Sequence, residues 1–336
     1  GQRPIFHETQ ITDEWGAVPI SRERVMIDIE YLKRIKLVSE PFGQKIVAHL
    51  LLLPNYRIFQ KVDIRIENAE RIPRGESVIF AMNHTDRFNY WPFQYKLLKM
   101  HEFPFTTVWV KAKYYKNAFL AKGLDLCNLI PVPSMGYLIE EYYRKTFKRK
   151  MDRGLYRAVN DVIDGRMAEM GPQQHAAVEA LQKMGEHFSD FIQTQYEGVM
   201  EKVAELSRTA LFERKLNLII FPEGTRSMKL AEGRTGLAQL ALHTEKRIVP
   251  VACNNSEQVY RGSLPFARSG RITYRIGTPL SVYDRLRDFR IREPFRLLSR
   301  ESQQRYRDHF EGVTKIVMES IERMLDEKYR RGYAAT

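Results

Sequence analysis

One polar segment between an apolar run and a segment with helical spacing constrains the fold most. Residues 221–227 (FPEGTRS) follow the apolar residues 216–220 and precede residues 229–242, so we expect a buried strand, a tight loop and a helix. Gly224 lets the backbone turn sharply and brings amides close to a ligand, and Arg226 offers a planar set of donors suited to phosphate or carboxylate. The segment predicts an anion-binding loop; the alternative is a strand-ending turn with a surface salt bridge.

A histidine lies at the end of a second predicted strand. Residues 78–82 (VIFAM) are apolar and lead into residues 83–89 (NHTDRFN). His84 would then stand at a strand end ahead of a helix, where α/β proteins place catalytic groups, and imidazole can take a proton near neutral pH. A histidine in this position is more often structural when it stands alone, so its meaning depends on the other segments.

Three blocks occur in a specific order: N-H at a strand end, the 221–227 loop, and residues 248–251 (IVPV) after the next helix. Together they resemble the glycerolipid (lysophospholipid) acyltransferase superfamily. Residues 108–113 (VWVKAK) are similar to the family's lysine-containing segment, and the resemblance extends over about residues 62–280. It implies an α/β fold with a mixed, largely parallel sheet flanked by helices. It also implies transfer of a fatty acyl group from a thioester to the hydroxyl of a lysophospholipid, with 1-acylglycerol 3-phosphate as the expected acceptor.

The sequence departs from the family pattern at two places. The pattern N-H-x-x-x-x-D has aspartate five positions after the histidine, but Asn89 stands there and Asp86 is the nearest carboxylate. The family's second block ends in arginine, whereas residues 126–133 (LCNLIPVP) contain none. We expect His84 to be the general base. Either Asp86 or Asn89 could orient its ring, and an aspartate just inside a helix start is also a common cap for backbone amides.

The resemblance assigns the acceptor's phosphate to the 221–227 loop. Arg226 and the loop amides would contact the phosphate oxygens, and Glu223 would fix Arg226. Because no serine or cysteine is visibly paired with His84, we expect direct attack by the lipid hydroxyl without an acyl-enzyme. The expected substrate-binding residues are Glu223, Gly224, Thr225, Arg226 and Lys111.

Net charge and cysteine content limit the kinds of partner and the cellular compartment that suit this chain. A formal net charge of +13 favours an anionic partner, either membrane headgroups or a phosphorylated thioester carrier. No nucleic-acid recognition motif accompanies this charge, so we expect no nucleic-acid partner. Cys127 and Cys253 stand in apolar, strand-like contexts, which predicts buried thiols, a reducing compartment and no metal site. We expect no cofactor, with acyl-CoA or acyl-carrier protein as co-substrate.

Two segments bear on membrane contact. The longest apolar run, residues 46–54, is well short of the roughly 20 residues that span a bilayer, and residues 1–13 show no secretory signal. We expect a cytoplasmic protein, peripherally associated with the inner face of the membrane. Residues 44–59 could pack under the sheet or lie in a membrane interface. The aromatic and basic residues between 137 and 157 suit an anionic membrane or carrier, or a solvated charged face over an aromatic core.

The order of predicted elements divides the chain into regions. A first helix over residues 21–37 is expected to begin at Ser21 as its N-cap. The predicted regions are an N-terminal helical segment over 1–56, an acyltransferase α/β core over 57–280 with a helical insertion at about 136–215, and a C-terminal helical extension over 281–336.

Two other functions remain open beside the expected one. The first is acyl transfer to a different lysolipid or to a small hydroxyl or amine acceptor. The second is non-catalytic binding of lipid or acyl carrier by the same fold.

Overall fold

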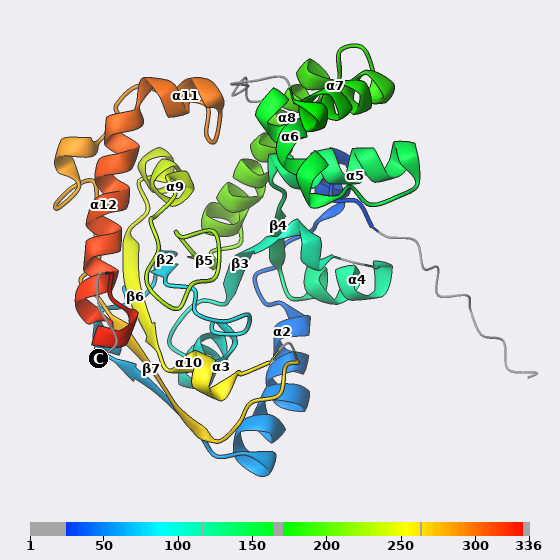
Figure 1. Cartoon of the computed structure of the whole chain (residues 1–336). Helices are drawn as coiled ribbons and strands as arrows, with labels where there is room; N and C mark the ends of the chain where they lie inside the picture. The colour runs from blue at the N-terminus through cyan, green and yellow to red at the C-terminus, as the bar shows by residue number, and fades with distance from the viewer. Residues whose placement is uncertain (1–24, 116, 164–170, 263, 332–336) are drawn as a thin grey trace, which may run out of the picture.

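The fold is organised around one mixed sheet. The computed structural model describes residues 25–331 except 116, 164–170 and 263, and within these residues the strand order is β1-β7-β6-β2-β5-β3-β4 (Figure 1). The pair β6–β7 is antiparallel and the other pairs are parallel, so the predicted mixed, largely parallel sheet is confirmed. The strands are β1 Val62–Glu67, β2 Ile79–Met82, β3 Thr106–Lys111, β4 Leu129–Val132, β5 Asn217–Ile220, β6 Ile248–Asn254 and β7 Gly270–Ile276.

Burial along the strands follows their place in the sheet. Strands β2, β5 and β6 are buried at every position, as expected for central strands with both faces of the sheet covered. Edge strand β1 alternates buried and exposed residues along its first half, which is the period-two pattern of a half-buried strand. The continuous apolar runs near residues 79 and 218 therefore mark the centre of the sheet.

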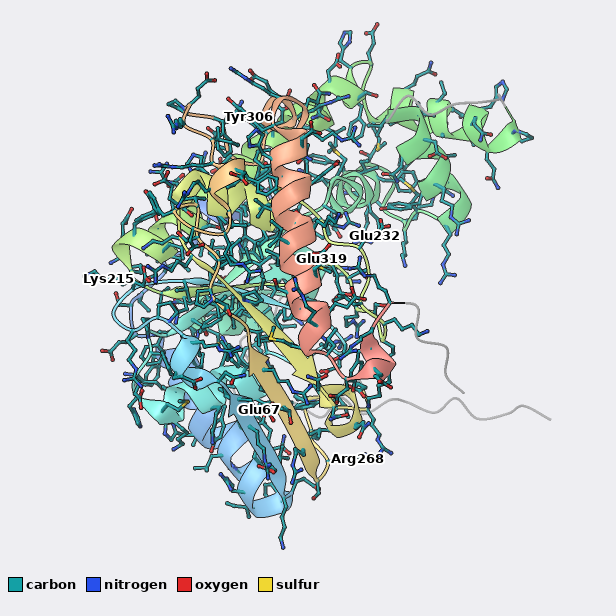
Figure 2. The ribbon with its side chains drawn as sticks, turned by 90° about the vertical axis from the view of Figure 1, so that its left-hand side faces the viewer. Glu67, Lys215, Glu232, Arg268, Tyr306 and Glu319 are labelled. Atoms are coloured by element: carbon teal, nitrogen blue, oxygen red, sulfur yellow. The ribbon has the colours of Figure 1, made fainter. Side chains whose placement is uncertain are left out.

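Helices cover both faces of the sheet. On one face Phe80 and Met82 pack with Phe93 of α3 (Trp91–Met100) and with Tyr56 of the N-terminal helical segment. Tyr56 lies in the part of the chain over residues 42–59, which consists of α2 (Phe42–Ile46) and the π-helical turns Val47–Leu52 and Asn55–Phe59. On the other face Ile79 and Ala81 pack with α9 (Gly236–Thr244) and α12 (Arg307–Met324). In Figure 2 α12 starts near Tyr306, and Glu319 lies farther along it.

The region predicted as a helical insertion lies beside strand β4 in Figure 1. A separate apolar cluster holds this region to the sheet. It joins Ile130 of β4 to Leu138, Val159 and Val199 of the insertion helices and to Leu32 of α1 (Ile29–Arg34). The insertion helices are α5 Met135–Phe147, α6 Arg153–Ile163, α7 Pro172–Met184 and α8 Phe188–Arg208. The remaining α-helices of the described residues are α4 Ala118–Leu126, α10 Ser256–Val259 and α11 Arg300–Arg305, and a π-helical turn, Thr209–Glu213, follows α8.

Three local predictions need comment. Within the described chain α1 begins after Asp28, whose side chain accepts a hydrogen bond from the Tyr31 amide, and the predicted cap Ser21 lies outside the described residues. The predicted helix over residues 229–242 is wrong for its first turns, because α9 begins at Gly236. Cys253 lies buried in β6 as predicted, whereas Cys127 is half-buried and follows helix α4 instead of lying in a strand.

The aromatic residues between 137 and 157 pack inward. Tyr143 is buried against Phe147, and the Tyr137 hydroxyl accepts the Ile27 amide. Tyr137, Tyr142, Phe147 and Tyr156 are half-buried, an arrangement in keeping with the alternative of a charged face over an aromatic core. Within residues 25–331, masked positions apart, no helix is both long enough and apolar enough to cross a bilayer.

Candidate active site

The site forms where β2 and β5 end. These strands pair in parallel, Ile79 with Leu218 and Ala81 with Ile220, so their carboxyl ends lie at the same edge of the sheet. The loop after β2 carries His84 and the loop after β5 carries Gly224. Parallel pairing therefore brings together two sequence blocks separated by about 140 residues, at the edge where α/β sheets bind ligands.

Asn89 orients the ring of His84. The ring Nδ1 lies 3.2 Å from the Asn89 side-chain oxygen, and the Asn89 amide nitrogen donates to the Asn83 carbonyl at 2.7 Å. Because the nitrogen is committed to that carbonyl, the Asn89 oxygen must face the ring and accept from Nδ1–H. This arrangement leaves His84 Nε2 without a proton, as the atom able to accept one.

Asn83 fixes this loop to the neighbouring strand. Its side-chain oxygen accepts the Cys253 amide at 2.7 Å, and its side-chain nitrogen donates to the Cys253 carbonyl at 3.0 Å. The side chain thus replaces one rung of the β2–β6 ladder where the ladder ends. The first residue of the N-H block is therefore structural, while the second is available for chemistry.

The carboxylate of Asp86 accepts hydrogen bonds from groups of its own turn. Its carboxylate accepts the Phe88 amide at 2.8 Å and the Thr85 hydroxyl at 3.2 Å. Burial raises the pKa of Asp86 to about 6, against these hydrogen bonds. Of the two candidates left open by the sequence, Asn89 is the one in hydrogen-bonding contact with the His84 ring, and Asp86 caps the backbone.

Glu223 joins the two loops and does not act as expected on Arg226. One carboxylate oxygen accepts the His84 amide at 2.7 Å and the other accepts the Ala231 amide at 2.8 Å. Burial raises the pKa of Glu223 to about 7, although both hydrogen bonds favour its charged form. The expectation that Glu223 fixes Arg226 is therefore wrong: both of its oxygens are taken up by backbone amides.

Two further contacts hold the loops together. The rings of His84 and Phe221 stack with centroids 4.1 Å apart, and the Ser227 amide donates to the His84 carbonyl at 2.9 Å. With the Glu223 bond, the backbone of His84 is held at both its amide and its carbonyl. The imidazole is therefore preorganised by the very loop predicted to bind the anion.

Cations surround the histidine. Burial lowers the pKa of His84 to about 4; the hydrogen bond to Asn89 opposes this, and the nearby cations Arg226 and Lys111 add to it. Burial also lowers the pKa of Lys111, helped by the charges of Lys113, Arg234 and Arg226. The positive charges of Arg226 and Lys111 thus act in the same direction as burial and favour the neutral form of the His84 imidazole.

Arg234 is a site residue that the sequence analysis missed. Gly224 adopts φ +62°, and a Cβ added there would lie 2.9 Å from the Arg234 Cδ. The Arg234 amide also donates to the Pro222 carbonyl at 2.8 Å. Glycine is thus required for the left-handed backbone and for the close approach of the arginine. Thr225 and Arg226 lie exposed on the same loop.

A cleft of about 1640 Å³ opens at this edge of the sheet. Among the predicted residues His84, Lys111 and Gly224 line it, whereas Thr225 and Arg226 are not among its lining residues. Asp86, Asn89 and Glu223 are buried. We call Lys111 and Arg234, which line the cleft with His84, its basic floor. Other lining residues are apolar and come partly from the insertion, with Val132, Met135, Ile163, Met200 and Leu298 among them, and four are glutamates: Glu140, Glu197, Glu232 and Glu311. The cleft is large enough for a lipid-sized ligand.

Comparisons with known proteins point to one family. Residues 164–254 match the family model described as Acyltransferase, a span that includes the 221–227 loop but not His84. An 87-residue stretch is 33% identical to a 1-acyl-sn-glycerol-3-phosphate acyltransferase from Cocos nucifera, covering 25% of this chain and 28% of that protein. The crystal structure of the 1-acyl-sn-glycerophosphate acyltransferase PlsC from Thermotoga maritima aligns with a TM-score of 0.38 and 15% identity, over 92% of this chain and 83% of that one. The family match confirms the resemblance to the acyltransferase superfamily that the motifs indicated.

Proposed function

We propose that this chain, which carries an acyltransferase-family segment, is an O-acyltransferase that moves a fatty acyl group from a thioester to the hydroxyl of a lysophospholipid. The observation that carries the proposal is the contact of 3.2 Å between His84 Nδ1 and the Asn89 side-chain oxygen. This contact commits Nδ1 to Asn89, and the His84 ring lines a cleft bordered by cations. A neutral imidazole with an available Nε2, beside an anion-binding floor, suits an acceptor that has both a hydroxyl and a phosphate.

In the proposed reaction Nε2 of His84 takes the proton of the acceptor hydroxyl as the hydroxyl oxygen bonds to the thioester carbonyl carbon. The tetrahedral intermediate then collapses, the carbon–sulfur bond breaks, and the proton passes from the imidazolium to the departing thiolate. Asn89 keeps the ring in the required tautomer, but as a neutral group it stabilises the imidazolium less than a carboxylate would. No covalent acyl-enzyme is needed.

The acceptor's phosphate is assigned to the basic floor of the cleft. Arg234 lies against Gly224, Lys111 comes from the neighbouring strand β3, and Arg226 is exposed on the loop that follows Gly224. A fork of guanidinium donors suits phosphate oxygens, and the left-handed Gly224 leaves room for a ligand close to the backbone. This supports 1-acylglycerol 3-phosphate as the acceptor class, with its acyl chain along the apolar lining residues of the cleft.

Acyl-CoA or acyl-carrier protein would be the donor, and no cofactor is required by this chemistry. We also propose peripheral association with an anionic membrane surface on the cytoplasmic side, where anionic lipids attract basic proteins. The net charge of +13 supports that partner.

The decisive experiment measures thioester consumption across a panel of lysolipid acceptors, with wild type and His84→Ala. We expect transfer to 1-acylglycerol 3-phosphate that is lost in the variant. Transfer to another lysolipid, or to a small hydroxyl or amine acceptor, would correct the acceptor and keep the reaction class. Binding of lysolipid or acyl carrier without turnover would establish a non-catalytic binding protein instead.

A further inference from the structure

Large apolar side chains are exposed on three segments that are far apart in the sequence. They belong to residues 42–59, residues 119–126 of α4, and residues 264–266 before β7. Leu50 is 75% exposed and Phe119 is 83% exposed. We call these three segments together the apolar face.

The three segments form one surface. A Cβ on Gly43 of α2 would lie 2.5 Å from the carbonyl oxygen of Leu126, so α2 is pressed against the end of α4. At the other end of residues 42–59, the Asn55 side chain donates to the Pro265 carbonyl at 3.2 Å and accepts the Ala267 amide at 3.3 Å. Figure 1 shows the chain after α10 passing beside the helices that follow α2. The segment 42–59 therefore links α4 to the 264–266 loop.

The inner side of residues 42–59 is fixed to the core. Ala48, Leu52 and Tyr56 are buried, and the hydroxyls of Tyr56 and Tyr260 lie 2.5 Å apart. Leu50 and Phe59 point away from that core and stay exposed. The two alternatives for this segment, core packing and interfacial placement, thus apply to its opposite sides.

Charge around the apolar face is mainly positive. Residues 41–61, 111–124 and 258–270 contain no aspartate or glutamate. Their exposed cations include Arg57, Lys61, Lys122, Arg261 and Arg268; Figure 2 labels Arg268 far from Tyr306. The exposed carboxylate of Glu40, beside the first segment, is paired with Lys45 at 2.6 Å. Exposed apolar side chains bordered mainly by cations are complementary to an interface of acyl chains below anionic headgroups.

The cleft opens at this face. Leu120 and Leu124 of α4 line the cleft together with Pro265, and the same cleft contains His84. Two edges of the apolar face are therefore also two walls of the cleft that holds the proposed base.

We propose that the apolar face lies in an anionic lipid interface and that the lipid acceptor enters the cleft laterally, between α4 and Pro265, without leaving the membrane. The proposal rests on the proposed function for the identity of the acceptor. The placement of the face rests on exposure and charge alone.

The first test is co-sedimentation with vesicles containing anionic phosphatidylglycerol. The variants are Leu50→Ser/Phe59→Ser and Phe119→Ser/Phe266→Ser, and the matched control is Phe212→Ser, an exposed phenylalanine outside the face. Removing two inserted side chains should weaken binding about tenfold or more, since each contributes burial of a large apolar group. The control should bind like wild type, and raised salt should weaken binding of all forms. Equal binding by variants and control would overturn the proposal.

The second test locates the mouth of the cleft. Phe119→Trp, Phe266→Trp and Phe59→Trp are compared with Phe212→Trp in vesicles of lipids brominated on the acyl chain. We expect quenching of the added tryptophan at the first three positions and not at position 212. Quenching at position 59 alone would show that the mouth stays outside the interface and would refute lateral entry.

Neither test requires turnover, so the membrane placement of the apolar face and the proposed acyl-transfer reaction can be refuted independently. Quenching at all three positions in a protein without acyl transfer would leave the membrane face intact and remove the proposed reaction. Conversely, the Leu50→Ser/Phe59→Ser variant should keep wild-type transfer to a short-chain, monomeric acceptor while losing transfer to vesicle-bound lipid. Wild-type rates of that variant on both acceptors would leave the reaction standing and remove lateral entry.

Discussion

The amide of Asn89 bonds in two directions at once: its oxygen lies 3.2 Å from Nδ1 of His84 and its nitrogen 2.7 Å from the carbonyl oxygen of Asn83. A carboxylate at this position could accept from the ring but could not donate to the carbonyl. Asparagine, in place of the family's aspartate, therefore satisfies both the ring of His84 and the backbone carbonyl of Asn83.

Asn89→Asp should raise the pKa of His84 and lower the stability of the protein. A nearby carboxylate favours the imidazolium, so the pKa of His84 should rise from about 4. Loss of the bond to the Asn83 carbonyl should cost about 1–3 kcal/mol in the free energy of unfolding. NMR titration and denaturant unfolding measure the two effects. Asn117→Asp is the control, because Asn117 caps α4 and aspartate caps equally well. A fully stable Asn89→Asp protein would contradict the role of the Asn83 carbonyl.

His84→Ala should abolish acyl transfer in a folded protein. The loss should be at least about 10²–10⁴-fold in turnover, which is the contribution of a general base. Circular dichroism and thermal unfolding check the fold, and His187→Ala, at an exposed histidine before α8, is the control. Near-normal turnover by His84→Ala would remove His84 from the chemistry.

The ionisation of His84 can be followed directly by NMR titration of its ring. A base whose pKa is lowered to about 4 is already neutral at pH 6, so the ring signals should show no inflection near the ordinary value of 6.5. Arg226→Gln removes a cation that disfavours the imidazolium, so it should raise the pKa of His84. Arg292→Gln, an exposed arginine elsewhere, should not change that pKa. A ring titration near 6.5 in the wild type would show that His84 is not held as the structure has it.

Gly224→Ala should impair acceptor binding by displacing Arg234. The new Cβ would meet the Arg234 Cδ at 2.9 Å, in addition to the strain of φ +62°. We expect the KM of the phosphorylated acceptor to rise about tenfold or more, since a misplaced guanidinium loses its paired contacts. Gly75→Ala is a matched control for backbone strain, because Gly75 has φ +78° with nothing within 4 Å of the added Cβ. An equal change in KM for both variants would exclude a specific effect on Arg234.

Glu223→Gln should loosen the two loops. A glutamine keeps one acceptor oxygen but turns an NH₂ group toward either the His84 amide or the Ala231 amide, both of which are donors. The mismatch should cost about 1–3 kcal/mol of stability. Hydrogen exchange should become faster at the amides of His84 and Ala231. Unchanged protection at both amides would show that the carboxylate does not join the loops.

Much of the sheet could be predicted because its signals are local. The alternation over residues 62–67 and the apolar runs before His84 and before residue 221 each correspond to a strand. The predicted helix start at residue 229 failed because the backbone there bonds elsewhere. The Leu230 amide donates to the Tyr329 carbonyl and the Ala231 amide to Glu223, partners that helical periodicity cannot reveal.

The site could be predicted in its residue types but not in all of its connections. Motif order identified His84 and the loop with Gly224, since each follows an apolar run. The role of Glu223 depends on an amide 139 positions away, and Arg234 has no signal beyond its charge. The apolar face was missed for the same reason, because it joins three segments that only the fold brings together.

The Asn83 side chain, hydrogen-bonded to the main chain of Cys253, also sets the order in which the His84 loop can mature. These partners are 170 residues apart, and closing so long a loop is an entropic cost that must be met before the contact forms. During synthesis the His84 loop would remain without its anchor until strand β6 had left the ribosome and paired with β2. Nascent chains that end before β6 should therefore have an unanchored histidine, and competence for proton transfer should arise late, after most of the domain has been made.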